Sequence, residues 1–281
     1  MQRMLFLISF FIASGSLGAQ IICSAEDSLL FHAKIIELED LSFEDDVELI
    51  IPLAKTFLGT PYVEKTLEIG STERLVINLR GLDCTTFVEN VMAFGLQLKK
   101  GDDSFRGFTK NLETVRYRNG KLNGYPSRLH YFTDWIRTNQ NKGLVRDITS
   151  ELGGDIVQKP IDFMGTHRNL YPFLADDSNF TKILKVESEL KGKDLCVLPQ
   201  NRIETQEAYI KNGDIIALAT SIKGLDVTHT GFAIRVEGRI HLLHASSSGN
   251  VTITKEPLVD YLKKIKSNTG IIVARPTLLS P

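Results

Sequence analysis

The chain has 281 residues, of which 42% are hydrophobic and 24% are charged, and its formal net charge at pH 7 is -1. This composition supplies enough apolar side chains for one compact domain and excludes global disorder. Because 33 basic residues are balanced by 34 acidic ones, the chain lacks the basic surplus that nucleic acids and anionic membranes require. We expect no nucleic-acid partner, and we expect a monomer.

The first residues have the layout of a secretory signal peptide. A short cationic start at 1–3 is followed by a mostly apolar run over 4–13 and then by small residues. The apolar run is too short to span a bilayer, and no later segment is long enough. We predict a signal peptide within residues 1–25, cleaved after Ala19 or after Ala25, and an exported, periplasmic protein.

Three cysteines are too few for a disulfide framework. Lipoprotein anchoring through Cys23 is not expected, because Ile22 is larger than the small residue that such a site requires. Cys196 lies in an apolar stretch and is expected to behave as a small hydrophobic residue. A thiol at Cys84 that stays free in an oxidising compartment invites a chemical explanation.

Two helices are predicted in the first third of the chain. Between residues 43 and 57 apolar side chains recur at helical spacing, and the glycine and proline within 59–61 end that helix. A second helix is predicted over 83–99, where Asp83 can cap the first turn and apolar side chains line one face. Cys84 then falls in the first turn of this helix.

The later part of the chain changes character twice. Residues 101–206 are mixed, with one helix predicted over 128–138, and we interpret this part as an insertion that carries specificity. After a turn at 212–214 the pattern becomes extended, and a short helix follows over 257–264. The predicted strands are 215–219, 230–236, 240–245, 251–253 and 270–274. Helices early and an antiparallel sheet late predict a single α+β catalytic domain over 26–281.

The position of Cys84 suits a nucleophile. A thiol attacks as the thiolate, and the positive end of a helix dipole is expected to lower its pKa. The backbone N–H groups of the same turn can hold the oxyanion that forms during attack on an amide. His229 lies about 145 residues downstream, within the separation of papain-type enzymes. A cysteine with a purely structural role is the alternative.

Strand geometry selects a third residue for this site. If residues 237–238 are the centre of an even-length hairpin loop, Gly231 faces His244 across the two strands. His244 is then the diagonal neighbour of His229 on the same face, where it can orient the imidazole. His241 points to the other face, whereas an odd-length loop would reverse the choice and favour His241.

Clustered histidines are also compatible with zinc. His229 and His244 could form a three-ligand site with Cys84 or with Asp226. The helical His-Glu pair of the usual zinc peptidases does not occur in the sequence. We therefore expect no metal and no other cofactor, and we keep a zinc amidase and purely structural histidines as alternatives.

Five segments carry a resemblance to a known family. They are LGTPYV (58–63), LDCTTF (82–87), NGDIIAL (212–218), THTGFAI (228–234) and LLHASS (242–247). In this order they resemble the blocks of the NlpC-type, papain-like cell-wall peptidases. The whole mature chain, including YPSRLHYFTDW and TSIKGLDVTHTG, more closely resembles the N-acetylmuramoyl-L-alanine amidase-like branch. The resemblance implies a papain-like fold with the nucleophile at the start of a helix that packs on an antiparallel sheet.

The resemblance also implies an activity and residue roles. It implies hydrolysis of an amide in peptidoglycan or muropeptides through an acyl-enzyme on Cys84. His229 would be the general base, and His244 would fix its tautomer. Tyr62 would lie beside the nucleophile and assist the oxyanion or the substrate. Asp83 would cap the helix and contact substrate.

Two departures from the superfamily pattern lie next to the expected cleft. The usual Asp-Cys-Ser-Gly is Asp-Cys-Thr-Thr at 83–86, and the common aromatic-Gly-Gly is replaced by Val-Glu-Lys at 63–65. The bond cleaved therefore cannot be inherited from the superfamily at large. The closer branch implies the bond between the muramic acid lactyl group and L-alanine. Cleavage after γ-D-glutamate and a cell-wall binding module without activity are the alternatives.

A sugar-peptide substrate calls for aromatic platforms with polar groups between them, and residues 125–131 offer that mixture. Arg128 could pair with a substrate carboxylate. The alternative is that this segment packs into the core, because Tyr131 and Trp135 are at helical spacing. The predicted substrate-binding residues, including two that flank the base, are Asp83, Tyr125, Ser127, Arg128, His130, Asp226 and Thr228.

Overall fold

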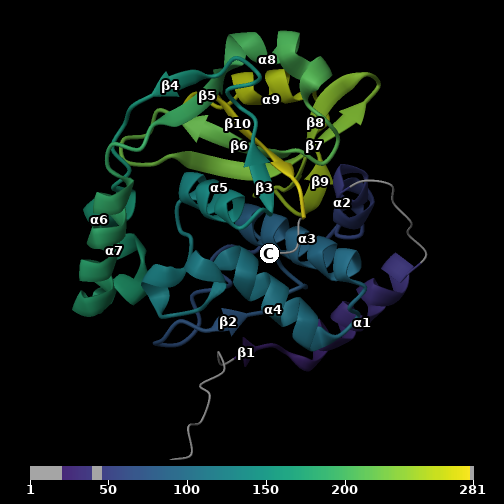
Figure 1. Ribbon diagram of the computed structural model, residues 1–281, viewed down its shortest axis with the longest axis vertical. Helices are drawn as coiled ribbons and strands as arrows, with labels where there is room; N and C mark the ends of the chain where they lie inside the picture. The colour runs from purple at the N-terminus through teal and green to yellow at the C-terminus, as the bar shows by residue number, and fades with distance from the viewer. Residues whose placement is uncertain (1–20, 40–45, 279–281) are drawn as a thin grey trace, which may run out of the picture.

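The computed structural model describes residues 21–39 and 46–278 (Figure 1). Most of the predicted signal peptide, including Ala19, lies outside the described residues. The last residues of the predicted signal peptide are described, and they include β1 (Ile21–Ile22), which pairs in parallel with β2 (Leu75–Val76). Cleavage after Ala25 would remove β1, whereas cleavage after Ala19 would retain it. Within the described residues, no helix is both long enough and apolar enough to span a bilayer.

Within the described residues, an eight-stranded sheet forms the centre of the molecule (Figure 1). Its strands run in the order β4-β5-β10-β6-β7-β8-β9, β3 also pairs with β10, and each of these pairings is antiparallel. The strands are β3 (Val145–Asp147), β4 (Asp155–Val157), β5 (Leu195–Pro199), β6 (Ile215–Thr220), β7 (Val227–Val236), β8 (Arg239–Ala245), β9 (Val251–Ile253) and β10 (Asn268–Pro276). The five predicted strands correspond to β6 through β10, so the α+β class is confirmed.

Helices cover both faces of this sheet (Figure 1). One face carries most of the early helices, which are α1 (Ala25–Glu39), α2 (Asp46–Lys55), α3 (Cys84–Lys100), α4 (Phe105–Arg116) and α5 (Phe132–Asn141). The other face carries α8 (Gln200–Gln206) and α9 (Leu258–Lys263). Beside the sheet lie α6 (Phe163–Thr166) and α7 (Asp177–Leu190). Five short 3-10 helices are described, at Arg118–Gly120, Tyr125–Ser127, Arg168–Leu170, Pro172–Ala175 and Glu207–Tyr209.

The central helix is α3, and its start is fixed by a capping box. Asp83 Oδ1 accepts a hydrogen bond from the backbone N–H of Thr86 at 2.7 Å, and Thr86 Oγ1 accepts one from the backbone N–H of Asp83 at 2.9 Å. The predicted cap at Asp83 is therefore confirmed. Further along, the ring of Phe87 packs edge-on against Phe232 of β7, with 5.5 Å between the centroids. These contacts place the first turn of α3 against the sheet.

Residues 101–206, predicted as an insertion, form part of the same fold. Its strands β3 and β5 both pair with β10, and α4 packs against α3. The predicted helices do not include α4, although Phe108, Leu112 and Val115 are spaced to bury one helical face, and all three are fully buried. Residues 101–206 therefore contribute to the central sheet and the shared hydrophobic core as well as to the surface.

Candidate active site

The Cys84 sulfur lies where α3 meets β7. Backbone N–H groups of Thr85 and Thr230 donate toward the sulfur, and Thr85 Oγ1 lies 4.0 Å from it. Thr230 directly follows His229 in β7. The structure therefore brings Cys84 and the backbone beside His229 together, although they are far apart in the sequence.

The pKa of Cys84 moves in the direction opposite to the one expected. Burial and the neighbouring Asp83 carboxylate together raise it to about 12, while the hydrogen bonds from Thr230 and Thr85 oppose the shift. The expected direction is therefore wrong for the resting site, because desolvation of the sulfur by burial is the largest contribution to the shift. The resting thiol is protonated at neutral pH and needs a base at the moment of attack.

The β7–β8 hairpin carries the two histidines. Glu237 and Gly238 form its two-residue loop with φ values of 48° and 84°, and Val236 pairs with Arg239. The loop is therefore of even length, which is the alternative that places His244 on the same face as His229. Accordingly, His229 Nε2 lies 2.5 Å from His244 Nδ1, and the two rings meet edge-on.

Burial sets the protonation of this pair. It lowers the pKa of His229 to about 3, to which the proximity of His244 contributes, and it lowers the pKa of His244 to about 4. Both rings are therefore neutral at pH 7. When His229 Nε2–H donates to His244, Nδ1 of His229 carries no proton and can accept one.

Gly231 makes room for the histidine pair. A Cβ atom at this position would lie 2.6 Å from the Leu243 carbonyl oxygen and 2.8 Å from His244 Cβ, both closer than van der Waals contact. His241, by contrast, donates from Nδ1 to the Thr254 carbonyl oxygen at 2.8 Å and has no contact with His229. The alternative that favoured His241 is therefore wrong.

Two tyrosines border the site. Tyr62 is half-buried, and its backbone N–H donates to the Gly249 carbonyl oxygen at 2.8 Å. Burial, together with the charge of an ionised Cys84, raises its pKa to about 12, so its hydroxyl stays protonated as a donor. Tyr261 of α9 lies edge-on to His244, 5.6 Å between the ring centroids, and its pKa is raised by burial and by Cys84. Sequence reasoning missed Tyr261, because no motif marks this position.

Of three residues predicted to bind substrate, Tyr125 is buried, whereas Ser127 and His130 are only partly buried. Tyr125 is 1% exposed and packs against Phe173 and His130. His130 Nε2 donates to the Tyr125 carbonyl oxygen at 2.9 Å, and burial holds the pKa of His130 well below its usual value. Ser127 Oγ donates to the Gly124 carbonyl oxygen at 2.7 Å. The core alternative therefore describes Tyr125, as it also describes the buried Tyr131 and Trp135, and substrate contact by Ser127 and His130 stays a prediction.

The charge of Arg128 is compensated by ion pairs inside the protein. It is 7% exposed, and its Nη2 donates to Glu68 Oε1 at 2.5 Å while its Nε lies 3.3 Å from Glu73 Oε1. Two carboxylates thus compensate the guanidinium and raise its pKa. The prediction that Arg128 is free to pair with a substrate carboxylate needs correction, although Arg128 does line a cavity beside Asp83.

Asp226 and Thr228 flank His229 in different ways. Asp226 is 2% exposed and accepts hydrogen bonds from the backbone N–H and hydroxyl of Thr133 at 2.8 and 2.7 Å. It also accepts from the backbone N–H of Val227 at 2.8 Å, so it joins β7 to α5 and does not face substrate. Burial raises its pKa. Thr228 is exposed, and its contact with substrate stays a prediction.

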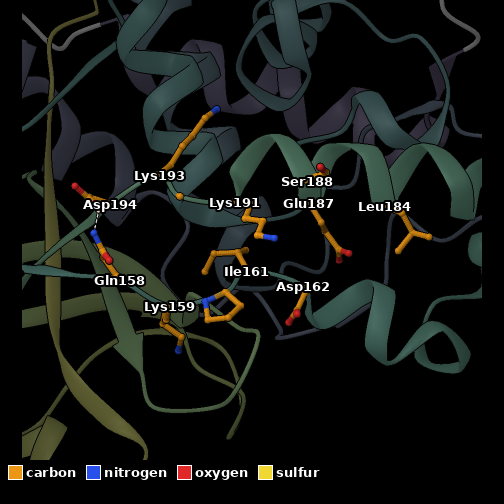
Figure 2. Close-up of a pocket in the computed structure, with 12 residues that line it drawn as sticks. Gln158, Lys159, Ile161, Asp162, Leu184, Glu187, Ser188, Lys191, Lys193 and Asp194 are labelled. Carbon is orange, nitrogen blue, oxygen red and sulfur yellow. Dashed lines mark hydrogen bonds between the residues drawn. The ribbon is translucent and has the colours of Figure 1, made fainter.

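Two cavities bear on where a substrate could lie. One of about 180 Å³ is next to Asp83. A larger groove of about 740 Å³ lies between the segment that follows β4 and the end of α7, where Asp162, Glu187 and Lys191 border it (Figure 2). None of the residues lining the larger groove belongs to the Cys84 site.

Across residues 21–39 and 46–278, no three His, Cys, Asp or Glu side chains are grouped to hold a metal ion, so the proposed zinc ligand sets do not assemble.

Comparison with known proteins shows one family. The sequence model of the family described as N-acetylmuramoyl-L-alanine amidase-like matches residues 52–271. No curated protein matches the chain. Among solved structures, an N-acetylmuramoyl-L-alanine amidase from Bacteroides uniformis is 39% identical, with a TM-score of 0.79, and the match covers 83% of this chain and 99% of that one.

Two further solved structures share the fold. A Bacteroides fragilis protein described as a candidate xylanase is 43% identical with a TM-score of 0.76, and the match covers 80% of this chain and 100% of that one. A Legionella pneumophila protein is 22% identical with a TM-score of 0.66, and the match covers 90% of this chain and 95% of that one. The first of these carries a different functional description from the amidase at similar identity, which provides a control substrate.

Proposed function

The chain belongs to the N-acetylmuramoyl-L-alanine amidase-like family, and on this premise we propose that it is a cysteine hydrolase that cleaves an amide bond of peptidoglycan or muropeptides. Cys84 is the nucleophile, His229 the general base, and His244 the residue that orients the base. The observation that carries the proposal is the hydrogen bond between the two histidines, next to the residue whose N–H donates to the Cys84 sulfur.

The reaction begins with a neutral Cys84 thiol and a neutral His229 imidazole. As the Cys84 sulfur attacks the amide carbonyl carbon, Nδ1 of His229 takes the thiol proton, because neither a thiolate nor an imidazolium is present at rest. His244 accepts the hydrogen bond from Nε2 of His229 and so keeps the reactive tautomer. The proton transfer accompanies attack and prevents a charge from resting on the buried sulfur.

The developing oxyanion needs donors. The backbone N–H of Cys84, at the start of α3, is one proposed donor, and the protonated Tyr62 hydroxyl is a second. When the tetrahedral intermediate collapses, the carbon–nitrogen bond breaks and the leaving amine takes the proton from His229. Water, deprotonated by His229, then attacks the thioester, and Cys84 leaves with the proton returned to its sulfur.

The bond cleaved and the type of fold are finer assignments. We propose the bond between the muramic acid lactyl group and L-alanine as the one cleaved, and a papain-like arrangement in which α3 presents its first residue beside an antiparallel sheet. Cleavage after γ-D-glutamate is the second candidate. The N-terminal sequence supports a proposal of export to the periplasm.

The deciding experiment is hydrolysis of a defined muropeptide by the wild type and by Cys84→Ala, with Cys196→Ala as the matched cysteine control. We expect Cys84→Ala to lower kcat by at least about 10³-fold and Cys196→Ala to leave it unchanged. Mass spectrometry should find free sugar and intact peptide. Activity that survives Cys84→Ala contradicts the mechanism.

The alternatives give different results in the same assay. Release of an L-alanyl-γ-D-glutamyl dipeptide indicates the endopeptidase. Loss of activity with a chelator and its return with zinc indicate a metal amidase. Binding without turnover indicates a cell-wall binding module. Xylan serves as the control polymer for the description attached to the Bacteroides fragilis structure, and its hydrolysis would contradict an amidase.

A further inference from the structure

A groove lies between α4 and the β1–β2 pair, which occupy the end of the molecule away from α8 and α9 (Figure 1). Three segments line it, within residues 72–75, 106–113 and 121–124, together with Ile21 of β1. Its volume is about 820 Å³, and none of its lining residues belongs to the Cys84 site. This α4 groove is therefore a surface feature separate from the proposed catalytic centre.

Positive charge dominates the α4 groove. Four exposed cations line it, at Arg74, Arg106, Lys110 and Lys121. Lys121 pairs with Glu113 at 3.2 Å, so its charge is compensated. In the described part of the chain, no ion pair or hydrogen bond involves the charged groups of Arg74, Arg106 and Lys110. Three positive charges are therefore left without a counter-charge.

The other carboxylate of the groove, Glu73, is already used inside the protein. It is buried, accepts a hydrogen bond from the Tyr117 hydroxyl at 2.8 Å and lies 3.3 Å from Arg128 Nε. On α4, Arg106 and Lys110 are four residues apart and share one face, where like charges repel. This repulsion destabilises the helix, and a bound anion would relieve it.

The chain enters the described structure at this groove. Ile21 is the first described residue, and it lines the groove with 46% of its surface exposed. Residues 14–20 connect it to the apolar run 4–13 of the predicted signal peptide, and seven residues span at most about 25 Å when fully extended. While that run is held in a bilayer during export, the groove therefore lies close to the lipid head groups.

We propose that the α4 groove binds the phosphate head groups of anionic phospholipids and so keeps the folded protein at the membrane surface. Arginine and lysine side chains form charge-assisted hydrogen bonds with phosphate oxygens, and clusters of them beside a membrane-inserted segment bind anionic bilayers. The net charge of -1 conceals this local cluster, so composition alone does not reveal it. The proposed role rests on the proposed export and is independent of the proposed catalysis.

Vesicle sedimentation tests the proposal. Protein exported by an expression host is mixed with vesicles of phosphatidylcholine alone or with about one-third phosphatidylglycerol. We expect at least about tenfold stronger partition onto the anionic vesicles and loss of most of this difference at high salt. The triple variant Arg74→Gln, Arg106→Gln and Lys110→Gln should partition at least about tenfold more weakly, because each cation near an anionic surface contributes about fivefold.

The matched control removes three positive charges elsewhere. It carries Lys182→Gln, Lys185→Gln and Lys191→Gln, which are exposed residues of the α7 region. Its partition should stay within about twofold of the wild type, because these charges lie outside the groove. Circular dichroism reports whether each variant is folded. If the groove triple variant does not fold, Arg106→Gln alone replaces it, with an expected loss of about fivefold.

The outcomes separate this site from the proposed activity. Equal partition onto both kinds of vesicle, or equal losses in the groove and control variants, overturns the proposal. Sedimentation with purified peptidoglycan that depends on the three groove cations, without binding to anionic vesicles, also overturns it and assigns the groove to a carboxylate polymer. The groove variant should keep wild-type kcat on a soluble muropeptide. Failure of the wild type to hydrolyse any muropeptide contradicts the proposed function, and the lipid site stands if the vesicle results hold.

Discussion

Replacement of Gly231 by alanine tests the geometry on which the histidine pair depends. The added Cβ would lie 2.8 Å from His244 Cβ and 2.6 Å from the Leu243 carbonyl oxygen, whereas ordinary contact begins at 3.4 Å. Relief of the contact with His244 Cβ requires His244 to move by about 0.6 Å. The contact with the Leu243 carbonyl oxygen involves backbone, which can move little in a packed sheet. We expect this displacement to weaken the 2.5 Å hydrogen bond to His229.

The Gly231→Ala change should affect both stability and turnover. Overpacking of this kind costs about 1–3 kcal/mol of unfolding free energy, which denaturant titration measures. Misplacement of an orienting group by a fraction of an ångström should lower kcat by about tenfold to hundredfold with little change in KM. Crystal coordinates of the variant would report the distance between the two imidazoles.

The matched control is Gly249→Ala, also next to the site. No atom lies within 4 Å of a Cβ at this position, and its φ is outside the left-handed range. We expect wild-type stability and activity from it. If Gly231→Ala also kept wild-type kcat, the role assigned to His244 as the group that orients the base would be refuted.

Three further predictions address protonation, the oxyanion and the core. Because burial lowers the pKa of His244 to about 4, the native state binds fewer protons than the unfolded one between that pH and 6.5. The contribution of His244 to the free energy of unfolding therefore falls as the pH drops, by up to about 1.4 kcal/mol per pH unit. In denaturant unfolding, the His244→Asn variant should lose less stability than the wild type between pH 7 and pH 5. An identical pH dependence in the variant would contradict this. Tyr62→Phe should lower kcat by about 10²-fold at nearly constant KM in steady-state kinetics, whereas unchanged kcat removes Tyr62 from the oxyanion site. Arg128→Met leaves the carboxylates of Glu68 and Glu73 without their cation and should cost about 3–5 kcal/mol in chemical denaturation, and a loss below about 1 kcal/mol would show that the pairs are not structural.

The catalytic arrangement could be predicted where it depends on local rules. The cap at Asp83 and the two-residue loop of the β7–β8 hairpin are properties of short segments, and each sets the direction of the neighbouring side chains through the period of its helix or strand. From the loop alone, the facing of Gly231 and His244 can be deduced. The pairing of His229 with His244 is therefore readable from the sequence.

Other features depend on partners that no local pattern identifies. Arg128 is paired with a carboxylate 60 residues earlier in the chain, and without that knowledge its charge looks available to a ligand. Asp226 is likewise bound to Thr133, 93 residues away. The direction of the Cys84 pKa shift could not be predicted either, because desolvation depends on how completely the finished fold covers the sulfur.

The place of β10 in the sheet has a consequence for the order of assembly. This strand is the last one described in the chain, yet it lies between β5 and β6 and holds β3 as well. A nascent polypeptide cannot join the two halves of its sheet before residues 268–276 have been made. Such a late closure would leave the growing chain incompletely folded until this strand is made, and a premature stop codon shortly upstream would leave two unjoined halves for proteolysis.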